Sequence, residues 1–179
     1  MKFITLLRGI NVGGKNKVAM PELRQCLENA GFDNVVTYIN SGNIIFESNE
    51  TNLEKLTNII ELSIKDRFDL QIPCLVIQAD ELITTLVQAP EWWDKEGGKH
   101  NAIFVMAPMD AKTIVETIGE IKPTYERVAI SGRIIFWSAP LETFSKTRYS
   151  KIVKSNYYQY ITIRNSKTTK KLSQICQSN

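Results

Sequence analysis

The sequence predicts an α+β protein: two ferredoxin-like βαββα(β) subdomains with antiparallel or mixed sheets, followed by a helical basic C-terminal tail. Strand-length apolar runs and helical apolar stripes alternate in the order β-α-β-β-α-β-α, then β-α-β-β-α. In addition, SGNIIFES (41–48) and SGRIIFWS (131–138) share six of eight residues at matching places in the two halves. We interpret this as an internal duplication. The alternative is that two Ser-Gly hairpins resemble each other by chance.

The first half begins with residues 2–9, an apolar run of strand length. Pro21 suits the first turn of the helix that follows, and Gly31 suits its end. Two strands, 34–40 and 43–48, are joined by a Ser-Gly turn. The half closes with a helix capped by Thr51 or Asn52, a strand at 73–79 and a short helix that ends at Pro90.

The loop 90–100 contains a Gly-Gly pair and predicts the boundary between the halves. The second half then has a strand at 101–107, a capped helix at 110–121 and a hairpin at 125–130 and 133–139. In the tail we expect a helix near 148–158, an extended piece at 160–164 and a helix at 166–176. The predicted domains are therefore 1–90, 101–142 and a basic helical segment, 143–179, packed on the body.

Strand alternation predicts which side chains face the helices. Ile44 and Phe46 should do so in the first half, and Ile134 and Phe136 in the second. The opposite face would then show Ile45 or Ile135 and Trp137. Such a face can stack nucleotide bases or form the contact between the two halves, and we favour the contact.

Composition narrows the class of protein. The chain has 179 residues, and no apolar run approaches the ~18 residues of a membrane-spanning helix. Its three cysteines lie far apart without a C-x-x-C pair, so we expect neither disulfides nor a metal site. We expect a cytoplasmic protein without a cofactor and without a membrane partner.

Charge is distributed unevenly along the chain. After Glu142 the tail has eight basic and no acidic residues, so residues 1–142 carry −5 of the net charge of +3. The first 21 residues also lack acidic side chains. This pattern indicates an anionic partner, a nucleotide or nucleic acid. The alternative is a basic tail that packs on the acidic body and neutralises it.

The stretch RGINVGGKNK, residues 8–17, is one residue short of a P-loop. Asn16 stands where Ser or Thr must bind Mg²⁺, and Pro21 disturbs any helix that begins at Gly14. We predict instead that main-chain amides freed by glycines at positive φ converge on an anion, helped by neighbouring side chains. The alternative is a plain turn with solvated lysines. The candidate residues are Arg8, Asn11, Gly13, Gly14, Lys15 and Lys17.

The second candidate stretch is TIRNSKTTKKL, residues 162–172. Arg164 ends a strand and Asn165 caps the last helix, and a helix N-terminus beside an arginine can hold an anion. Ordinary capping is the alternative. Ser41 and Asn43 of the first hairpin complete the set of candidate ligand-binding residues.

LLRGINVGGKNKV, YINSGNIIFES and TIRNSKTTKKL closely resemble the motifs of a bacterial family called domain of unknown function 1697, in the same order along nearly the whole chain. The resemblance implies a cytosolic bacterial protein of two related α+β halves. The family has no established activity, so it implies no catalytic residue. Its last motif commonly has Trp after Arg-Asn, where this chain has Ser166.

Three functions are compatible with the sequence. We favour a binding module for a phosphate-bearing partner. An enzyme acting on a small anionic metabolite is the alternative, although the only histidine, His100, falls in the boundary loop and the known catalytic motifs are absent. A protein-interaction module anchored by Trp92, Trp93 and Trp137 is the third.

Overall fold

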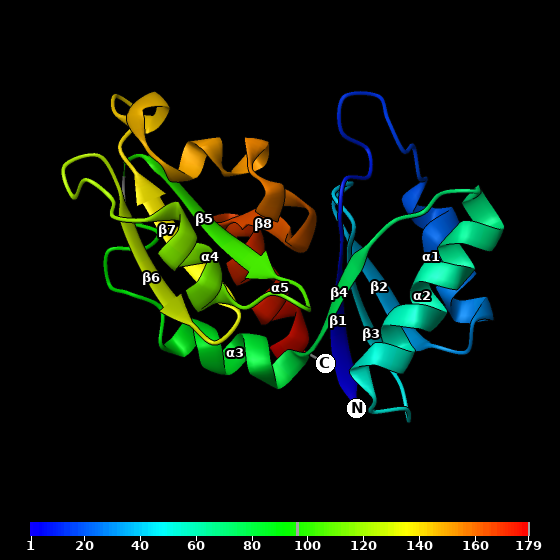
Figure 1. Ribbon diagram of the computed structural model, residues 1–179. Helices are drawn as coiled ribbons and strands as arrows, with labels where there is room; N and C mark the ends of the chain where they lie inside the picture. The colour runs from blue at the N-terminus through cyan, green and yellow to red at the C-terminus, as the bar shows by residue number, and fades with distance from the viewer. Residues whose placement is uncertain (96, 179) are drawn as a thin grey trace. The chain divides into compact units, whose positions relative to one another are not determined.

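Figure 1 shows a computed structural model that describes residues 1–95 and 97–178. The chain forms two compact units, one of Met1–Leu82 with Leu172–Asn179 and the other of Ile83–Lys171. Each unit contains a four-stranded antiparallel sheet, and the strand orders, β2-β3-β1-β4 and β6-β7-β5-β8, are equivalent. This is the ferredoxin-like order, so the predicted α+β fold is confirmed.

The first unit follows the predicted succession of elements. Two helices cover one face of its sheet, where Phe46 stacks on Phe3 at 5.6 Å and contacts Phe32 at 4.5 Å between ring centroids. Ile44 and Phe46 belong to this core, as the alternation predicted. The elements are β1 (Lys2–Leu7), α1 (Met20–Asn29), β2 (Asp33–Tyr38), β3 (Asn43–Glu47), α2 (Leu53–Phe68) and β4 (Cys74–Gln78), followed by α3 (Ala79–Val87).

In the second unit, two short 3₁₀-helices form the stretch where a helix near 148–158 was expected, and a third precedes them. The predicted helix is therefore present as 3₁₀ turns and not as one continuous helix. The Ser150 and Ser155 hydroxyls donate to the carbonyls of Thr147 and Ile152, three residues back, and such bonds favour tight turns over an α-helix. The elements are β5 (Lys99–Val105), α4 (Ala111–Ile118), β6 (Arg127–Ser131), β7 (Ile134–Ala139), η1 (Phe144–Lys146), η2 (Tyr149–Lys154), η3 (Asn156–Tyr160) and β8 (Ile161–Asn165). The last helix, α5 (Ser166–Gln177), begins in this unit, and its residues from Leu172 belong to the first.

The prediction that Ile134 and Phe136 face the helices is wrong. Ile135 and Trp137 instead enter the core that contains Ile114 of α4. Relative to the shared motif, the buried face is offset by one residue: Ile44 and Phe46 lie in the first core, whereas Ile135 and Trp137 lie in the second. A shift of one residue along a strand moves every side chain to the other face.

No helix in the described part of the chain has the length and apolar composition needed to cross a bilayer.

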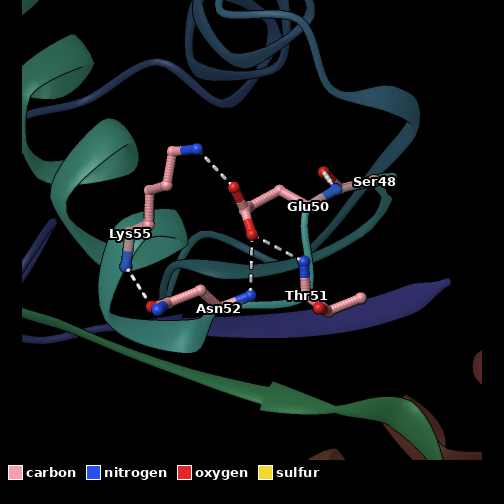
Figure 2. A network of polar contacts seen from close by, with 5 residues as sticks. All are labelled: Ser48, Glu50, Thr51, Asn52 and Lys55. Carbon is pink, nitrogen blue, oxygen red and sulfur yellow. Dashed lines mark hydrogen bonds and ion pairs between the residues drawn. The ribbon is translucent and has the colours of Figure 1, made fainter.

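The start of α2 shows how the sequence fixes a helix boundary (Figure 2). The Asn52 side chain accepts the Lys55 amide at 2.9 Å, which confirms Asn52 as the cap. The Glu50 carboxylate accepts the amides of Thr51 and Asn52, both at 2.9 Å, and pairs with the Lys55 ammonium. The Lys55 contact first, and then the backbone amides, lower the pKa of Glu50 from an ordinary 4.5 to about 2.

This network predicts a pH-dependent contribution to stability. Because the pKa of Glu50 is lower in the folded protein, its ionised form stabilises the fold above about pH 4.5, and this contribution is lost as the pH falls towards about 2. In urea unfolding at about pH 6, the midpoint of the wild-type protein should be higher than that of Glu50→Gln. At about pH 2 the two midpoints should converge. Glu54→Gln is the control, because Glu54 has no ion pair among the described residues and should show a smaller convergence. A midpoint difference for Glu50→Gln that is the same at both pH values would contradict the prediction.

Candidate functional site

The glycine-rich loop of the first unit folds into a tight hairpin. The Lys15 amide donates to the Val12 carbonyl at 3.1 Å, and Gly13 and Gly14 between them have φ of 58° and 78°. Two consecutive positive φ values define a type I′ turn, which non-glycine residues rarely form. The positive φ predicted for both glycines is confirmed, and the chain uses it to reverse direction. In Figure 1 this loop extends beyond the end of β1.

Part of the hydrogen-bonding capacity of this loop is used internally. The Asn11 amide donates to Asn16, and the Asn11 side chain donates to the carbonyls of Val18 and Asn40 at 2.9 and 3.0 Å. Asn16 donates to the Gly9 carbonyl at 3.0 Å. The amides of Gly13 and Gly14 meet no acceptor within residues 1–95 and 97–178, and Lys15 and Lys17 are exposed.

Ser41 and Asn43 lie in the β2–β3 hairpin of the same unit. The buried Asn43 amide group donates to the Tyr38 carbonyl at 3.0 Å and to the Ser41 hydroxyl at 2.9 Å. These contacts stabilise the four-residue connection between the two strands.

Arg164 and Asn165 belong to the second unit, so each unit has its own group of candidate residues. Asn165 caps α5 by accepting the Thr168 amide at 2.7 Å, as predicted. Arg164 is 7% exposed, and burial lowers the pKa of its guanidinium to about 10. It donates to the Thr162 hydroxyl at 2.8 Å and to the Ile163 carbonyl at 2.9 Å.

The chain supplies its own carboxylate at the start of α5. Desolvation acts to raise the pKa of Asp94, but hydrogen bonds from Lys170 and Ser166 outweigh it and lower that pKa. The Lys170 ammonium lies 2.6 Å from the Asp94 carboxylate. Asp94 therefore occupies the kind of position that the sequence suggested for an external anion.

The second unit also has a pocket that the sequence analysis missed, here called the cationic pocket. Its volume is about 510 Å³. Four cationic side chains line it: Lys122, Lys146, Arg148 and Lys151. The Lys122 and Lys146 ammonium groups lie 5.6 and 5.7 Å from the centroid of the half-buried Tyr125 ring. Arg148 is fixed by a 2.9 Å hydrogen bond from its guanidinium to the Ile118 carbonyl.

Among the residues that the structure describes, Glu126 is the only carboxylate that lines the cationic pocket. It is 2% exposed and accepts the amides of Arg148 and Tyr149 at 2.6 and 3.2 Å and the Trp137 indole N–H at 3.1 Å. The Glu126 carboxylate thus fixes the backbone at Arg148 and Tyr149. Within the described residues, the three lysines of the pocket pair with no carboxylate, so its accessible groups are cationic.

Only part of this pocket could be recognised in the sequence. Lys146, Arg148 and Lys151 belong to the acid-free tail whose charge the sequence analysis noted. Lys122 and Tyr125 precede β6, and the folding of β6 and β7 brings them to the tail. Two of the three tryptophans proposed as interaction anchors, Trp93 and Trp137, are buried at 7% and 3% exposure.

Comparison with known proteins identifies relatives but no activity. The family model described as protein of unknown function (DUF1697) matches residues 1–136. The solved structure of conserved bacterial protein SP0830 from Streptococcus pneumoniae has a TM-score of 0.87 and 34% sequence identity, and the similarity covers 98% of each chain. No curated protein matches the chain.

Proposed function

The chain belongs to the DUF1697 family of proteins of unknown function, and we propose that it binds a phosphate-bearing ligand, a nucleotide or a nucleic acid. The observation that carries this proposal is the cationic pocket, where four cations surround one aromatic ring. Lysine and arginine are the side chains that bind phosphate oxygens, through charge-assisted hydrogen bonds. The buried Glu126 carboxylate offsets only one of these four charges, and its oxygens accept backbone and indole N–H groups instead of pairing with a lysine.

The dimensions of the cationic pocket favour a small ligand or a short part of a polymer. Its volume of about 510 Å³ falls within the range of small-molecule sites, about 300–1,000 Å³. The half-buried Tyr125 ring supplies an apolar surface beside the cations. Aromatic rings of this kind stack on nucleotide bases while the surrounding cations bind phosphate.

The glycine-rich hairpin is the second element of the proposal. Lys15 and Lys17 are exposed, and the Gly13 and Gly14 amides have no acceptor among the residues described. Backbone amides at a glycine turn can bind phosphate oxygens because no Cβ blocks the approach. The hairpin can therefore contribute a phosphate contact of its own.

Fluorescence anisotropy with a labelled ATP analogue and a labelled single-stranded oligonucleotide tests the proposal. The two probes distinguish a nucleotide ligand from a nucleic acid. Lys146→Ala/Lys151→Ala should weaken binding about tenfold or more, since each substitution removes a charge-assisted hydrogen bond. For the oligonucleotide, the slope of log affinity against log salt should also become shallower by about 0.7 for each phosphate that the variant no longer neutralises. Lys15→Ala/Lys17→Ala reports whether the hairpin participates.

The matched control is Lys65→Ala/Lys154→Ala, which removes the same charge from exposed positions outside the pocket. Its affinity should stay within about twofold of wild type. The proposal fails if neither probe binds, or if the pocket variant and the control lose affinity equally, because net charge alone would then explain binding.

A further inference from the structure

The only histidine of the chain lies beside a serine hydroxyl in the second unit. The sequence placed His100 in the boundary loop, but it is part of β5 and pairs directly with Ser138 of β7. The His100 Nδ1 atom lies 2.7 Å from the Ser138 Oγ atom. Arg127 of β6 pairs with Ser138 from the other side, so the three residues form one row across the sheet.

The hydrogen bonds determine which nitrogen of His100 carries the proton. The Nε2 atom lies 2.8 Å from the Gly97 carbonyl oxygen, which can only accept a hydrogen bond. Nε2 must therefore be protonated in the neutral ring, and Nδ1 must accept the Ser138 O–H. A hydroxyl that donates to an imidazole, itself oriented by a third group, is the arrangement of an activated serine nucleophile.

A cavity gives a substrate access to this pair. Its volume is about 530 Å³, and His100 and Ser138 both line it. Ser138 is 7% exposed, so a reagent reaches it through this cavity. Trp92, Pro140 and Leu141 add apolar surface. Of the charged residues that line the cavity, Lys95 and Arg127 are cationic and Glu126 and Glu142 are anionic. A cavity with an apolar wall and balanced charges suits an uncharged ester. Arg127, the neighbour of Ser138 across the sheet, can stabilise the carbonyl oxygen that becomes negative during the reaction.

We propose that Ser138 and His100 form a hydrolytic site for small carboxylic esters. Ser138 Oγ attacks the carbonyl carbon and its proton passes to His100 Nδ1, while the oxyanion develops beside Arg127. The bond to the alcohol oxygen breaks, and His100 returns the proton to the leaving alcohol. Water then attacks the acyl-serine and gives a proton to His100. The acid leaves, and Ser138 regains its proton from His100.

A fluorophosphonate probe tests the pair directly, because such probes form a stable adduct with activated serines. Peptide mapping by mass spectrometry should place one adduct on Ser138 of the wild-type protein, and p-nitrophenyl butyrate should give a burst of product. His100→Gln should slow labelling at least about 100-fold, the contribution expected of a general base. Ser138→Ala should abolish it.

The matched control is Ser131→Ala, which removes a hydroxyl from β6 of the same sheet and should leave labelling unchanged. Thermal unfolding of each variant shows that it is folded before its rate is compared. An unlabelled Ser138 in folded wild-type protein would overturn the proposal, and so would equal labelling of wild type and His100→Gln. Either result would make the pair a cross-strand hydrogen bond without a catalytic role.

Discussion

Glu126→Ala is expected to lower the free energy of unfolding of the second unit by about 3–5 kcal/mol. The Glu126 carboxylate, 2% exposed, accepts three N–H groups, two from the backbone at Arg148 and Tyr149 and one from the Trp137 indole. Alanine would leave these donors without a partner, and each buried unsatisfied donor costs about 1–3 kcal/mol. The segment that presents Arg148 to the cationic pocket would lose its main polar anchor.

Tryptophan fluorescence is the suitable probe, because all three tryptophans lie in the second unit. Unfolding in urea should show a lower midpoint for Glu126→Ala than for wild type. Glu126→Gln should lie between them, because the glutamine oxygen still accepts an N–H group while its NH₂ group faces another donor. Glu142→Ala, at an exposed position, should stay within about 0.5 kcal/mol of wild type. A loss below about 1 kcal/mol for Glu126→Ala would show that water replaces the carboxylate.

Gly42→Ala should destabilise the first unit by about 3 kcal/mol or more. Gly42 has φ of 75°, and a Cβ there would lie 2.6 Å from Leu7 Cβ and 3.0 Å from Ile10 Cδ1. Both neighbours are buried core residues. The Leu7 amide donates to the Gly42 carbonyl at 2.8 Å, and this hydrogen bond keeps the two segments close together. The substitution therefore adds steric overlap to the cost of a left-handed conformation.

The repeated sequence motif provides a matched control for this prediction. Gly132 is the corresponding glycine of SGRIIFWS, with φ of 55°, but nothing lies within 4 Å of a Cβ built on it. Gly132→Ala should cost only the backbone term, about 1–2 kcal/mol. Far-UV circular dichroism in urea reports both units. Equal losses at the two glycines would show that Leu7 and Ile10 move aside without cost.

Local features of the sequence were good predictors of local structure. Pro21 lies in the first turn of α1, Asn52 and Asn165 cap their helices, and Gly13 and Gly14 take positive φ. Each of these outcomes depends on a residue and its immediate neighbours, through a fixed proline ring, a side-chain acceptor or the lack of a Cβ. The order of strands and helices follows from the period of the apolar residues in the same way.

The sequence misled where the outcome depended on distant partners. SGNIIFES and SGRIIFWS share six of eight residues, yet their strands show opposite faces to the helices: Phe46 pairs with Phe3 in the first core, whereas Ile135 pairs with Ile103 in the second. His100 was assigned to the boundary loop, but it belongs to β5 and its partner, Ser138, is 38 residues away. The cationic pocket joins Lys122 and Tyr125 to the tail across the β6–β7 hairpin.

The order of the amino acids was sufficient to establish the α+β class, the ferredoxin-like succession of elements, the helix caps and the accumulation of positive charge near the C-terminus. Which strand face is buried, which charges already have partners and which side chains share a cavity became known only from the folded chain. This division arises because propensity, capping and charge are properties of neighbours along the chain. Burial, hydrogen-bond satisfaction and enclosure depend instead on strand register and on packing between segments far apart in sequence.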